Sequence, residues 1–337
     1  VLASGTDAAM VINAALSGLT ADRTAKEKVR LEASASLAAR IEMPSFSILE
    51  CADGVVLTGA GNNQLLGCKS THDWEVHGGE WVCTYGEAKS SASPMYFTAP
   101  KNCLVEGAKA RDSLWNNIIV DNADGMVFRG VESYHSWAVD PANINATGWH
   151  GIIFQSNAKG CLVEGCFLHD CGHGGVYFYS NEDGQTGALN DNIMRNNRVE
   201  RCGCSGLSIS QRSSVGEGHR NIIEGNKLTD CGIDTQHPFI NVGWKSCYPA
   251  EGNIVRNNTL IDNGIVGPTG TGADQGIINQ GSNTEIYGND IQGVTGGIVL
   301  LCGSGLKVHD NNIHDAPNDT AIIIGSSVKD SVIENNT

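Results

Sequence analysis

Short apolar segments alternate with polar residues along most of the chain, and they recur at regular intervals. The stretch NIIEGNKLTDCG, residues 221–232, holds two such segments separated by a glycine–asparagine pair. Apolar residues at every second position are typical of strands with one buried face. Similar stretches return roughly every 30 residues in the second half of the chain, a period typical of solenoid proteins. The pattern therefore predicts stacked coils built from short strands.

Aligned on their centres, the repeats place the same kinds of residue at equivalent positions. The central positions are Cys166, Asn197, Asn226, Asn258, Asn289, Asn311 and Asn336, and a second column holds Cys171, Cys202, Cys231 and Asn263. A third apolar run follows in each repeat, such as GIIFQ, GVYFY and GLSIS. We expect each coil to have three strands, with the central asparagine in a left-handed bend between the first two. Copies about 4.8 Å apart could hydrogen-bond amide to amide as a ladder.

The N-terminal region has a different pattern, which predicts a short helix. Ala8 to Leu16 form its body, Thr6 or Asp7 its N-cap, and Gly18 lies near its C-cap. Such a helix would cover the first open coil, which solenoids require. We expect residues 1–30 to be this capping helix and the segment leading into the solenoid. Residues 31–337 would be the solenoid itself, ending in SVIENNT without a C-terminal cap.

With this repeat, the chain resembles the pectate-lyase-like superfamily of single-stranded right-handed parallel β-helices. The resemblance implies an all-β fold, the right-handed winding, and a polysaccharide groove over the third strand between two sets of variable loops. The helix DAAMVINAAL and the strands after it resemble the start of tail-spike proteins. Motifs of single enzymes match only in part: GHGG at 172–175 is similar to polygalacturonases, but their paired aspartates are missing. His150-Gly151 is similar to mannuronan epimerases, whereas Ala142 follows Asp140-Pro141 where those enzymes have histidine.

Charge and cysteine content narrow the function further. The formal charge of −15 disfavours a nucleic-acid partner, which requires a basic face. No apolar run of the roughly 18 residues needed for a membrane span occurs. The twelve cysteines favour buried free thiols over a disulfide framework, although two stacked thiols could still oxidise. The CGC stretch at 202–204 lacks the spacing of a zinc site.

The predicted groove floor follows from alternation along the third strand. Counting from the first residue of each run, even positions point outward. Tyr177 and Tyr179 fall in one coil, where their rings would suit stacking against sugars. The predicted floor is Ile153, Tyr177, Ser208, Ile240 and Ile278, followed by Gln155, Tyr179, Ser210, Val242 and Gln280.

The loop wall before the third strand carries titratable side chains in equivalent places of successive coils. These residues are His150, His173, Asp234, His237 and Asp274. Histidines with carboxylates serve as acid and base in proton abstraction or hydrolysis, or hold a metal ion. An ordinary role as solvated surface side chains remains the alternative. We expect His150, His173, Asp234 and His237 to gather on one side of the third-strand face.

The wall after the third strand offers cations. Arg212 and Lys245 lie at nearly equivalent positions of adjacent coils, and Trp244 precedes Lys245. Arginine suits a sugar carboxylate because its planar fork meets two oxygens. The positive charge of the arginine lowers the pKa of a lysine beside it, and a neutral lysine can act as a base. In β-helix lyases, which the chain resembles, a basic residue abstracts the proton while a second cation or Ca²⁺ neutralises the carboxylate.

The sequence thus favours an enzyme acting on an acidic, uronate-containing glycan, most simply a lyase or depolymerase. Hydrolase and epimerase chemistry stay open, because no complete catalytic motif is present. A non-catalytic spike or adhesin body is the alternative, since fold does not fix function. The resemblance places the protein outside the cell or on a virion or cell surface, allows a homotrimer, and indicates no cofactor beyond Ca²⁺.

Overall fold

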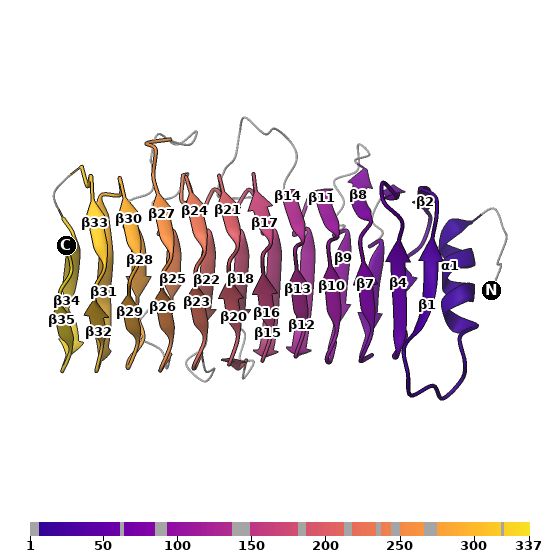
Figure 1. Ribbon diagram of the computed structural model, residues 1–337, viewed down its shortest axis with the longest axis horizontal. Helices are drawn as coiled ribbons and strands as arrows, with labels where there is room; N and C mark the ends of the chain where they lie inside the picture. Colours follow the sequence, from indigo (N-terminus) through magenta and orange to yellow (C-terminus); the bar gives the residue numbers. More distant parts are fainter. Residues whose placement is uncertain are drawn as a thin grey trace.

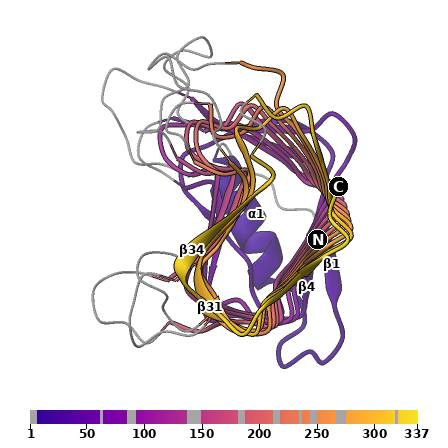
Figure 2. The ribbon, with the colours of Figure 1, turned by 90° about the vertical axis from the view of Figure 1, so that its left-hand side faces the viewer.

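The computed structural model of the chain is a parallel β-helix of three long sheets with one short helix at its N-terminal end (Figure 1). Successive coils superpose when viewed along the axis, and each sheet forms one side of the solenoid (Figure 2). The structure describes residues 7–60, 64–84, 93–136, 149–180, 187–211, 218–233, 237–243, 250–265, 275–317 and 320–337.

The three sheets, here called A, B and C, follow one another around every coil, as the repeat predicts. Sheet A has 12 strands: β1 (Glu27–Leu31), β4 (Ser47–Cys51), β7 (Glu75–His77), β10 (Leu104–Glu106), β13 (Val127–Arg129), β16 (Leu162–Glu164), β20 (Ile193–Arg195), β23 (Ile222–Glu224), β26 (Ile254–Arg256), β29 (Glu285–Tyr287), β32 (Lys307–His309) and β35 (Val332–Glu334). Sheet B has 11: β2 (Ala35–Leu37), β5 (Val56–Ala60), β8 (Glu80–Thr84), β11 (Lys109–Ser113), β14 (Glu132–Ser136), β17 (Phe167–His169), β21 (Arg198–Glu200), β24 (Lys227–Thr229), β27 (Thr259–Ile261), β30 (Asp290–Gln292) and β33 (Asn312–His314).

Sheet C contains the third strand of each repeat. Its strands are β3 (Ile41–Glu42), β6 (Leu66–Lys69), β9 (Met95–Thr98), β12 (Ile118–Asp124), β15 (Ile152–Lys159), β18 (Val176–Ser180), β22 (Leu207–Gln211), β25 (Ile240–Val242), β28 (Gln275–Asn279), β31 (Gly296–Ser304), β34 (Ile322–Lys329) and the short β19 (Leu189–Asn190) beside β15.

The core is the interior of the solenoid, where inward side chains of the three sheets stack coil on coil. Aromatic rings form part of this stack. Trp74 and Phe97 lie with ring centroids 5.0 Å apart, and the stack continues through Phe128, Phe154 and Phe178. All five side chains are fully buried. Each strand is too short to bury a core alone, so stability depends on its copies above and below.

The predicted asparagine ladder is confirmed. The Nδ2 groups of Asn197, Asn226 and Asn258 each donate to the Oδ1 of the next asparagine at 2.9 Å. The ladder continues through Asn289 and Asn311 to Asn336. Cys166 begins this column, and its backbone N–H donates to Asn197 Oδ1.

The left-handed conformation belongs to the residue before each ladder asparagine, which corrects the sequence prediction. Asn196, Gly225, Asn257 and Gly288 have φ angles of 54°, 63°, 54° and 62°, whereas the ladder asparagines do not have positive φ. Glycine and asparagine tolerate this conformation best, which explains the recurring NN and GN pairs. The first residue of the pair makes the bend, and the second points inward and stacks.

A second asparagine ladder lies before sheet A and was not predicted. Asn192 donates through Nδ2 to Asn221 Oδ1 at 2.9 Å, and Asn221 donates to Asn253 at 3.0 Å. These residues precede the first strand in the stretches DNI, RNI and GNI. Both corners of sheet A therefore have buried amide stacks in the middle coils.

The prediction of buried free thiols is confirmed for ten cysteines, including Cys171, Cys202 and Cys231 of the second repeat column. Cys302 differs, because it is disulfide-bonded. The thiol column therefore acts mainly as small inward filler of the core.

The predicted N-terminal helix is also present. α1 (Ala8–Ser17) has Asp7 as its N-cap, whose side chain accepts from the N–H groups of Ala9 and Met10, and Gly18 as its C-cap. Buried Ile12 and Leu16 join the solenoid core, so the helix covers the first coil. Sheet A begins at Glu27, a few residues before the predicted boundary at residue 31. No described helix is long and apolar enough to cross a membrane.

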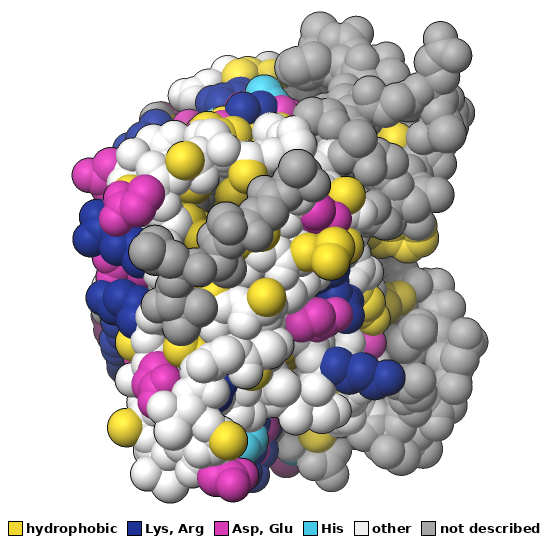
Figure 3. Space-filling view, turned by 90° about the vertical axis from the view of Figure 1, so that its right-hand side faces the viewer, with side chains coloured by type: hydrophobic (Ala, Val, Ile, Leu, Met, Phe, Trp, Pro, Cys, Tyr) yellow, Lys and Arg dark blue, Asp and Glu magenta, His cyan; other side chains and the backbone are white. Residues whose placement is uncertain are grey.

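The outer column of sheet A alternates in charge from coil to coil. Arg129 contacts both Glu106 and Glu164 at 3.3 Å, and Arg195 bonds Glu164 at 2.7 Å. Arg256 and Glu224 form a pair of 2.6 Å further along. In Figure 3, charged side chains of both signs gather on the left-hand edge, the side of β1 and β4 in the opposite view of Figure 2. Because these charges neutralise one another, this face does not form a patch of one sign.

Candidate functional site on the outer face of sheet C

The outer face of sheet C carries a second buried cluster, separate from the interior core. Ile119, Ile153, Tyr177 and Cys204 form it, with Tyr96, Trp115 and Tyr179 packed around them. The strand register places four members of the cluster in one outward column, which consists of Tyr96, Ile119, Ile153, Tyr177, Ser208, Asn241 and Ile278. The column changes from apolar to polar in its middle coils, which distinguishes those coils as a candidate site.

The polar part of this floor is held by its own hydrogen bonds. Ser208 Oγ and Ser210 Oγ lie 2.5 Å apart, and Asn241 Nδ2 reaches both hydroxyls at 3.3 Å. All three side chains are buried. The floor between β18 and β25 is therefore an ordered, buried polar network.

The register corrects two predicted floor residues. Asn241 pairs with Ser208, whereas Ile240 pairs with Leu207 and points into the core together with Val242. The sequence prediction took Pro238 as the first residue of the run PFINV. The register shows instead that Phe239 is equivalent to the glycine that opens the other runs. A slip of one residue exchanges the two faces of a strand.

Tyr177 differs from the predicted open stacking ring. Its side chain is only 5% exposed, and its hydroxyl donates to Cys204 Sγ at 3.2 Å. Burial is the main reason that the pKa of Tyr177 lies well above its ordinary value. Gly174 makes room for the ring, because a Cβ there would lie 2.1 Å from Tyr177 Cε2. Tyr179, in the same strand, is half-buried.

A row of larger side chains borders the floor on the side where the chain enters sheet C. It is found by counting three residues back from the paired residues Ile118, Ile152, Val176, Leu207 and Ile240. The row, here called the wall row, consists of Trp115, Trp149, His173, Cys204 and His237. Two indoles are thus followed by two imidazoles with a thiol between them.

The histidines gather as predicted. The ring centroids of His150 and His173 are 4.6 Å apart, and those of His173 and His237 are 6.5 Å apart. Tyr177 lies beneath, with its ring 4.2 Å from that of His150 and 5.4 Å from that of His173. The prediction that His173 and His237 share one face of sheet C is therefore confirmed.

The coil between the two histidines allows them to approach each other. It carries Cys204, Ser205 and Gly206, all small and buried. The N–H of Cys204 donates to the carbonyl of His173 at 2.5 Å, and the carbonyl of Cys204 accepts from Gly232 at 2.7 Å. A large side chain at Cys204 would separate His173 from His237.

His150 lies deeper than the wall row, and its protonation site can be assigned. Asn116 Oδ1 accepts the backbone N–H of His150 at 2.9 Å and lies 2.8 Å from Nδ1. An amide oxygen only accepts, so we assign the proton to Nδ1 and the lone pair to Nε2. Within the described chain, Nε2 is buried without a hydrogen-bond partner. Burial, together with nearby His173, holds the pKa of His150 well below its usual value.

His237 is partly exposed, and burial of its ring lowers its pKa. Its imidazole is therefore neutral at neutral pH and can accept a proton. Together the wall row offers two imidazoles at the edge of a polar floor. This arrangement suits proton transfer to or from a ligand that lies on sheet C.

Several predicted site residues lie outside the described residues. They are Lys245, Arg212, Trp244, Asp234 and Asp274. Among the described residues, no group of three or more histidine, cysteine, aspartate or glutamate side chains is placed to hold a metal ion.

The sequence prediction missed Trp115, Trp149 and Asn116. The signal was present in the stretches LWNN at 114–117 and GWHG at 148–151. Both place a tryptophan directly before the residue that becomes part of the Asn116–His150 pair. Recognising this required the register between two coils of unequal length.

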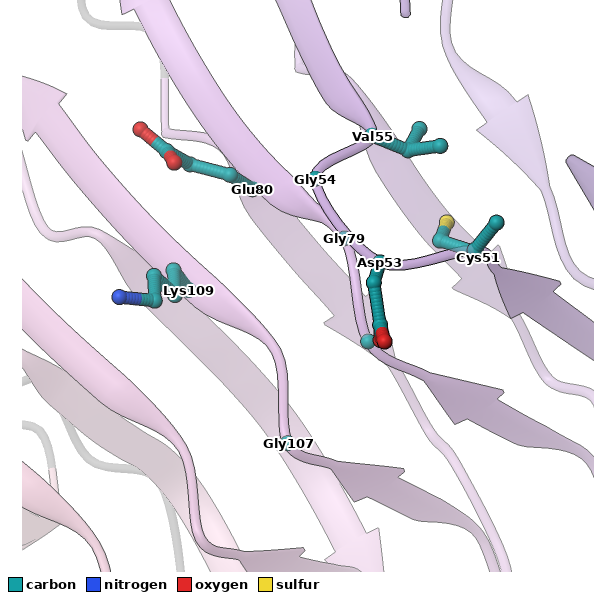
Figure 4. Close-up of a pocket in the computed structure, with 10 residues that line it drawn as sticks. Cys51, Asp53, Gly54, Val55, Gly79, Glu80, Gly107 and Lys109 are labelled. Atoms are coloured by element: carbon teal, nitrogen blue, oxygen red, sulfur yellow. The ribbon is translucent and has the colours of Figure 1, made fainter. Parts of the chain in front are cut away.

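A shallow depression elsewhere is not part of this site. It measures about 220 Å³ and lies at the turn between sheets A and B, lined by Cys51, Gly54, Gly79, Glu80 and Lys109 among others (Figure 4). Of the charged side chains at its rim, Lys109 pairs with Glu132 and Glu80 with Arg111.

Comparison with known proteins agrees with this fold. A family described as right-handed β-helix region matches residues 40–237 and, in an overlapping match, residues 136–277. A search of curated protein sequences finds no match.

Similar solved structures share the fold at low sequence identity. The catalytic unit of an α-1,3-glucanase from Streptomyces thermodiastaticus is 12% identical with a TM-score of 0.61, covering 99% of this chain and 67% of that one. An alginate lyase from Paenibacillus sp. is 14% identical with a TM-score of 0.58, covering 95% and 97%. The Dettilon tailspike protein is 13% identical with a TM-score of 0.62, covering 95% and 65%.

Proposed function

The chain belongs to the right-handed β-helix region family, and we propose that it is an enzyme acting on a polysaccharide bound along the outer face of sheet C. The proposal rests on the wall row, in which the ring centroids of His173 and His237 lie 6.5 Å apart beside the polar floor. Neighbours named as a glucanase, an alginate lyase and a tailspike support a glycan as ligand. The proposed place of action is outside the cell or on a virion or cell surface.

The reaction we propose is elimination in an acidic, uronate-containing glycan. A base takes the proton next to the carboxylate, and the electron pair of that C–H bond forms a carbon–carbon double bond. The bond to the glycosidic oxygen breaks, and that oxygen takes a proton from an acid. His237 is the proposed base because burial lowers its pKa and keeps it neutral. His173, its neighbour in the wall row, is the proposed acid.

The sequence prediction of Arg212 and Lys245 as catalytic cations is retained as part of this proposal. Arg212 would hold the substrate carboxylate, and Lys245 competes with His237 for the role of base. Asp234, which lies close to His237 in the sequence, and Asp274 remain proposed substrate contacts, as does Trp244. A Ca²⁺ ion could share the neutralisation of the carboxylate.

The test is turnover on three polymers: polygalacturonate, alginate and an α-1,3-glucan. Elimination gives unsaturated products that absorb in the ultraviolet, whereas hydrolysis gives reducing ends without that absorbance. We expect ultraviolet absorbance from one uronate polymer and at least a roughly 100-fold loss of rate in His237→Gln, the scale of a lost general base. His314→Gln, on the outer face of sheet B, is the matched control.

Two outcomes would overturn the assignments. Full activity in His237→Gln with loss in Lys245→Ala would move the base to the other wall. Absence of any product from every polymer would favour the second candidate, a non-catalytic glycan-binding spike or adhesin body, which the tailspike-like fold favours.

A further inference from the structure

We propose that Trp115 and Trp149 form a pyranose-binding subsite, which holds one sugar unit of the glycan next to the unit at His173. This subsite rests on the proposed function, since it lies on the same bound chain. The two indoles are stacked with ring centroids 4.5 Å apart and an interplanar angle of 16°. They belong to adjacent coils, because Ile118 pairs with Ile152.

Trp115 and Trp149 are more exposed than the tryptophans of the solenoid core. Trp74 and Trp81 are fully buried in the solenoid core, whereas Trp115 and Trp149 are each half-buried. Trp115 packs on the outer cluster of sheet C and lies outside the interior core. Each indole thus keeps part of its surface open beside the polar floor.

The backbone beneath both indoles is fixed in the same way. Ser113 Oγ donates to the carbonyl of Trp115 at 2.5 Å, and Ser136 Oγ donates to the carbonyl of Trp149 at 2.6 Å. The two serines are register partners in sheet B. The Asn116–His150 pair ties the next residues of both coils together. Such prior ordering reduces the entropy lost when a ligand binds.

The chemistry of the pair fits the C–H face of a sugar ring. The inner faces of the stacked indoles cover each other, so a sugar would contact their outer faces and edges. An indole face is negative and attracts the weakly positive C–H hydrogens of a pyranose, while the ring N–H offers a donor to hydroxyls. Neither indole carries a charge, so this subsite would not require a carboxylate. Recognition of the uronate group would then fall to the unit beside His173.

Position along the axis links the subsite to the histidines. The wall row runs from Trp115 and Trp149 directly to His173, with one residue per coil. Coils are spaced by about 4.8 Å, so a glycan lying parallel to the axis passes the indoles before it reaches the imidazoles. The sequence predicts this use for the rings of Tyr177 and Tyr179, but Tyr177 is buried.

The test measures binding separately from turnover. Tetrasaccharides of galacturonate, of mannuronate and of α-1,3-glucan are titrated into the His237→Gln protein, and Kd is read from intrinsic tryptophan fluorescence and from calorimetry. We expect at least one to bind, with Kd raised about 10-fold or more by Trp149→Ala and by Trp115→Ala, a loss of about 1.4 kcal/mol in binding free energy. Trp149→Phe, which keeps a flat ring, should restore most of the affinity. Tyr287→Ala, which removes a stacked ring on sheet A, is the control and should leave Kd unchanged.

An unchanged calorimetric Kd in both alanine variants, with the fold intact by circular dichroism, would overturn the subsite even if the enzyme is active. Failure of all three tetrasaccharides to bind would overturn it as well. Binding that depends on the tryptophans, in a protein that turns over none of the polymers, would support the subsite and contradict the catalytic proposal.

Discussion

At the scale of single residues, the ladder asparagines and the residues before them have separate structural roles. Asn226 stacks in the ladder, since its Nδ2 donates to Asn258 Oδ1 and to the carbonyl of Met194, while its Oδ1 accepts from Asn197. Gly225 instead makes the bend, because it takes the left-handed conformation. The pairs NN and GN in the sequence thus encode a corner of the solenoid.

Asn226→Leu should destabilise the fold, because it removes the acceptor of the buried backbone N–H of Asn197 and the donor to the carbonyl of Met194. We expect the free energy of unfolding to fall by about 1–3 kcal/mol, the cost of an unsatisfied buried group. Lys227→Leu, at the exposed next position, should change it by less than about 0.5 kcal/mol. Denaturant titration measures both, and equal effects would contradict the role of the ladder.

Gly225→Val should cost about 1–2 kcal/mol, because a β-branched residue resists a φ of 63°. Gly225→Asn should be much milder, since Asn196 and Asn257 take the same conformation in neighbouring coils. Thermal unfolding of the pair checks this, and a valine variant as stable as the asparagine variant would refute it.

The proposed role of His237 as the base also predicts how the rate of turnover depends on pH. Burial lowers the pKa of His237, and a base must be neutral to act. The rate should therefore persist below about pH 6.5, the ordinary value for histidine, and fall only as the pH drops through the lowered pKa. A pH–rate profile on the cleaved polymer measures this. An acid limb centred above the ordinary histidine value would exclude His237 as the base.

At the scale of elements, the outer face of sheet B is joined by a charged network between coils. His169 Nδ1 lies 2.6 Å from Asp170, and Arg201 donates two bonds of 2.7 Å to the same carboxylate. Burial alone would raise the pKa of Asp170, but the hydrogen bonds from His169 and Arg201 outweigh it and hold the pKa well below its usual range. This network links β17 to β21.

Asp170→Asn should therefore destabilise the protein in a pH-dependent way. A carboxylate with a lowered folded-state pKa stabilises the fold above its unfolded pKa of about 3.9, and loses that effect as the pH falls towards the folded value. The stability gap between parent and variant should be constant from pH 7 to about pH 5 and shrink below pH 4. Unfolding curves at pH 7, 4 and 3 measure the gap. A gap that grows on acidification would contradict the assignment.

The residue pattern within each strand and turn also determines which parts of the fold and the site could be predicted from the sequence. Repeated asparagines mark equivalent positions in successive coils, so the three sheets, the ladder and the shared face of His173 and His237 could be predicted. The run PFINV could not be placed correctly, because Pro238 precedes the position that glycine occupies elsewhere and shifts the apparent phase by one residue. The stack of Trp115 on Trp149 depends on the register between two coils of unequal length, which the pattern does not contain.

At the scale of the whole molecule, each face of the solenoid has a different use. The outer column of sheet A neutralises its charges coil by coil, and the outer face of sheet B is joined by the Asp170 network. The middle coils of sheet C instead combine a polar floor, stacked indoles and clustered imidazoles. We therefore expect ligand binding and chemistry on one side of the solenoid.

The most direct test is a crystal structure of the His237→Gln protein soaked with a tetrasaccharide of the polymer that the parent cleaves, or of the one it binds. We expect a glycan lying along sheet C, with one ring on Trp115 and Trp149 and the next within hydrogen-bonding distance of His173. A glycan bound instead on the outer face of sheet A or sheet B, with the wall row untouched, would contradict a binding site on sheet C.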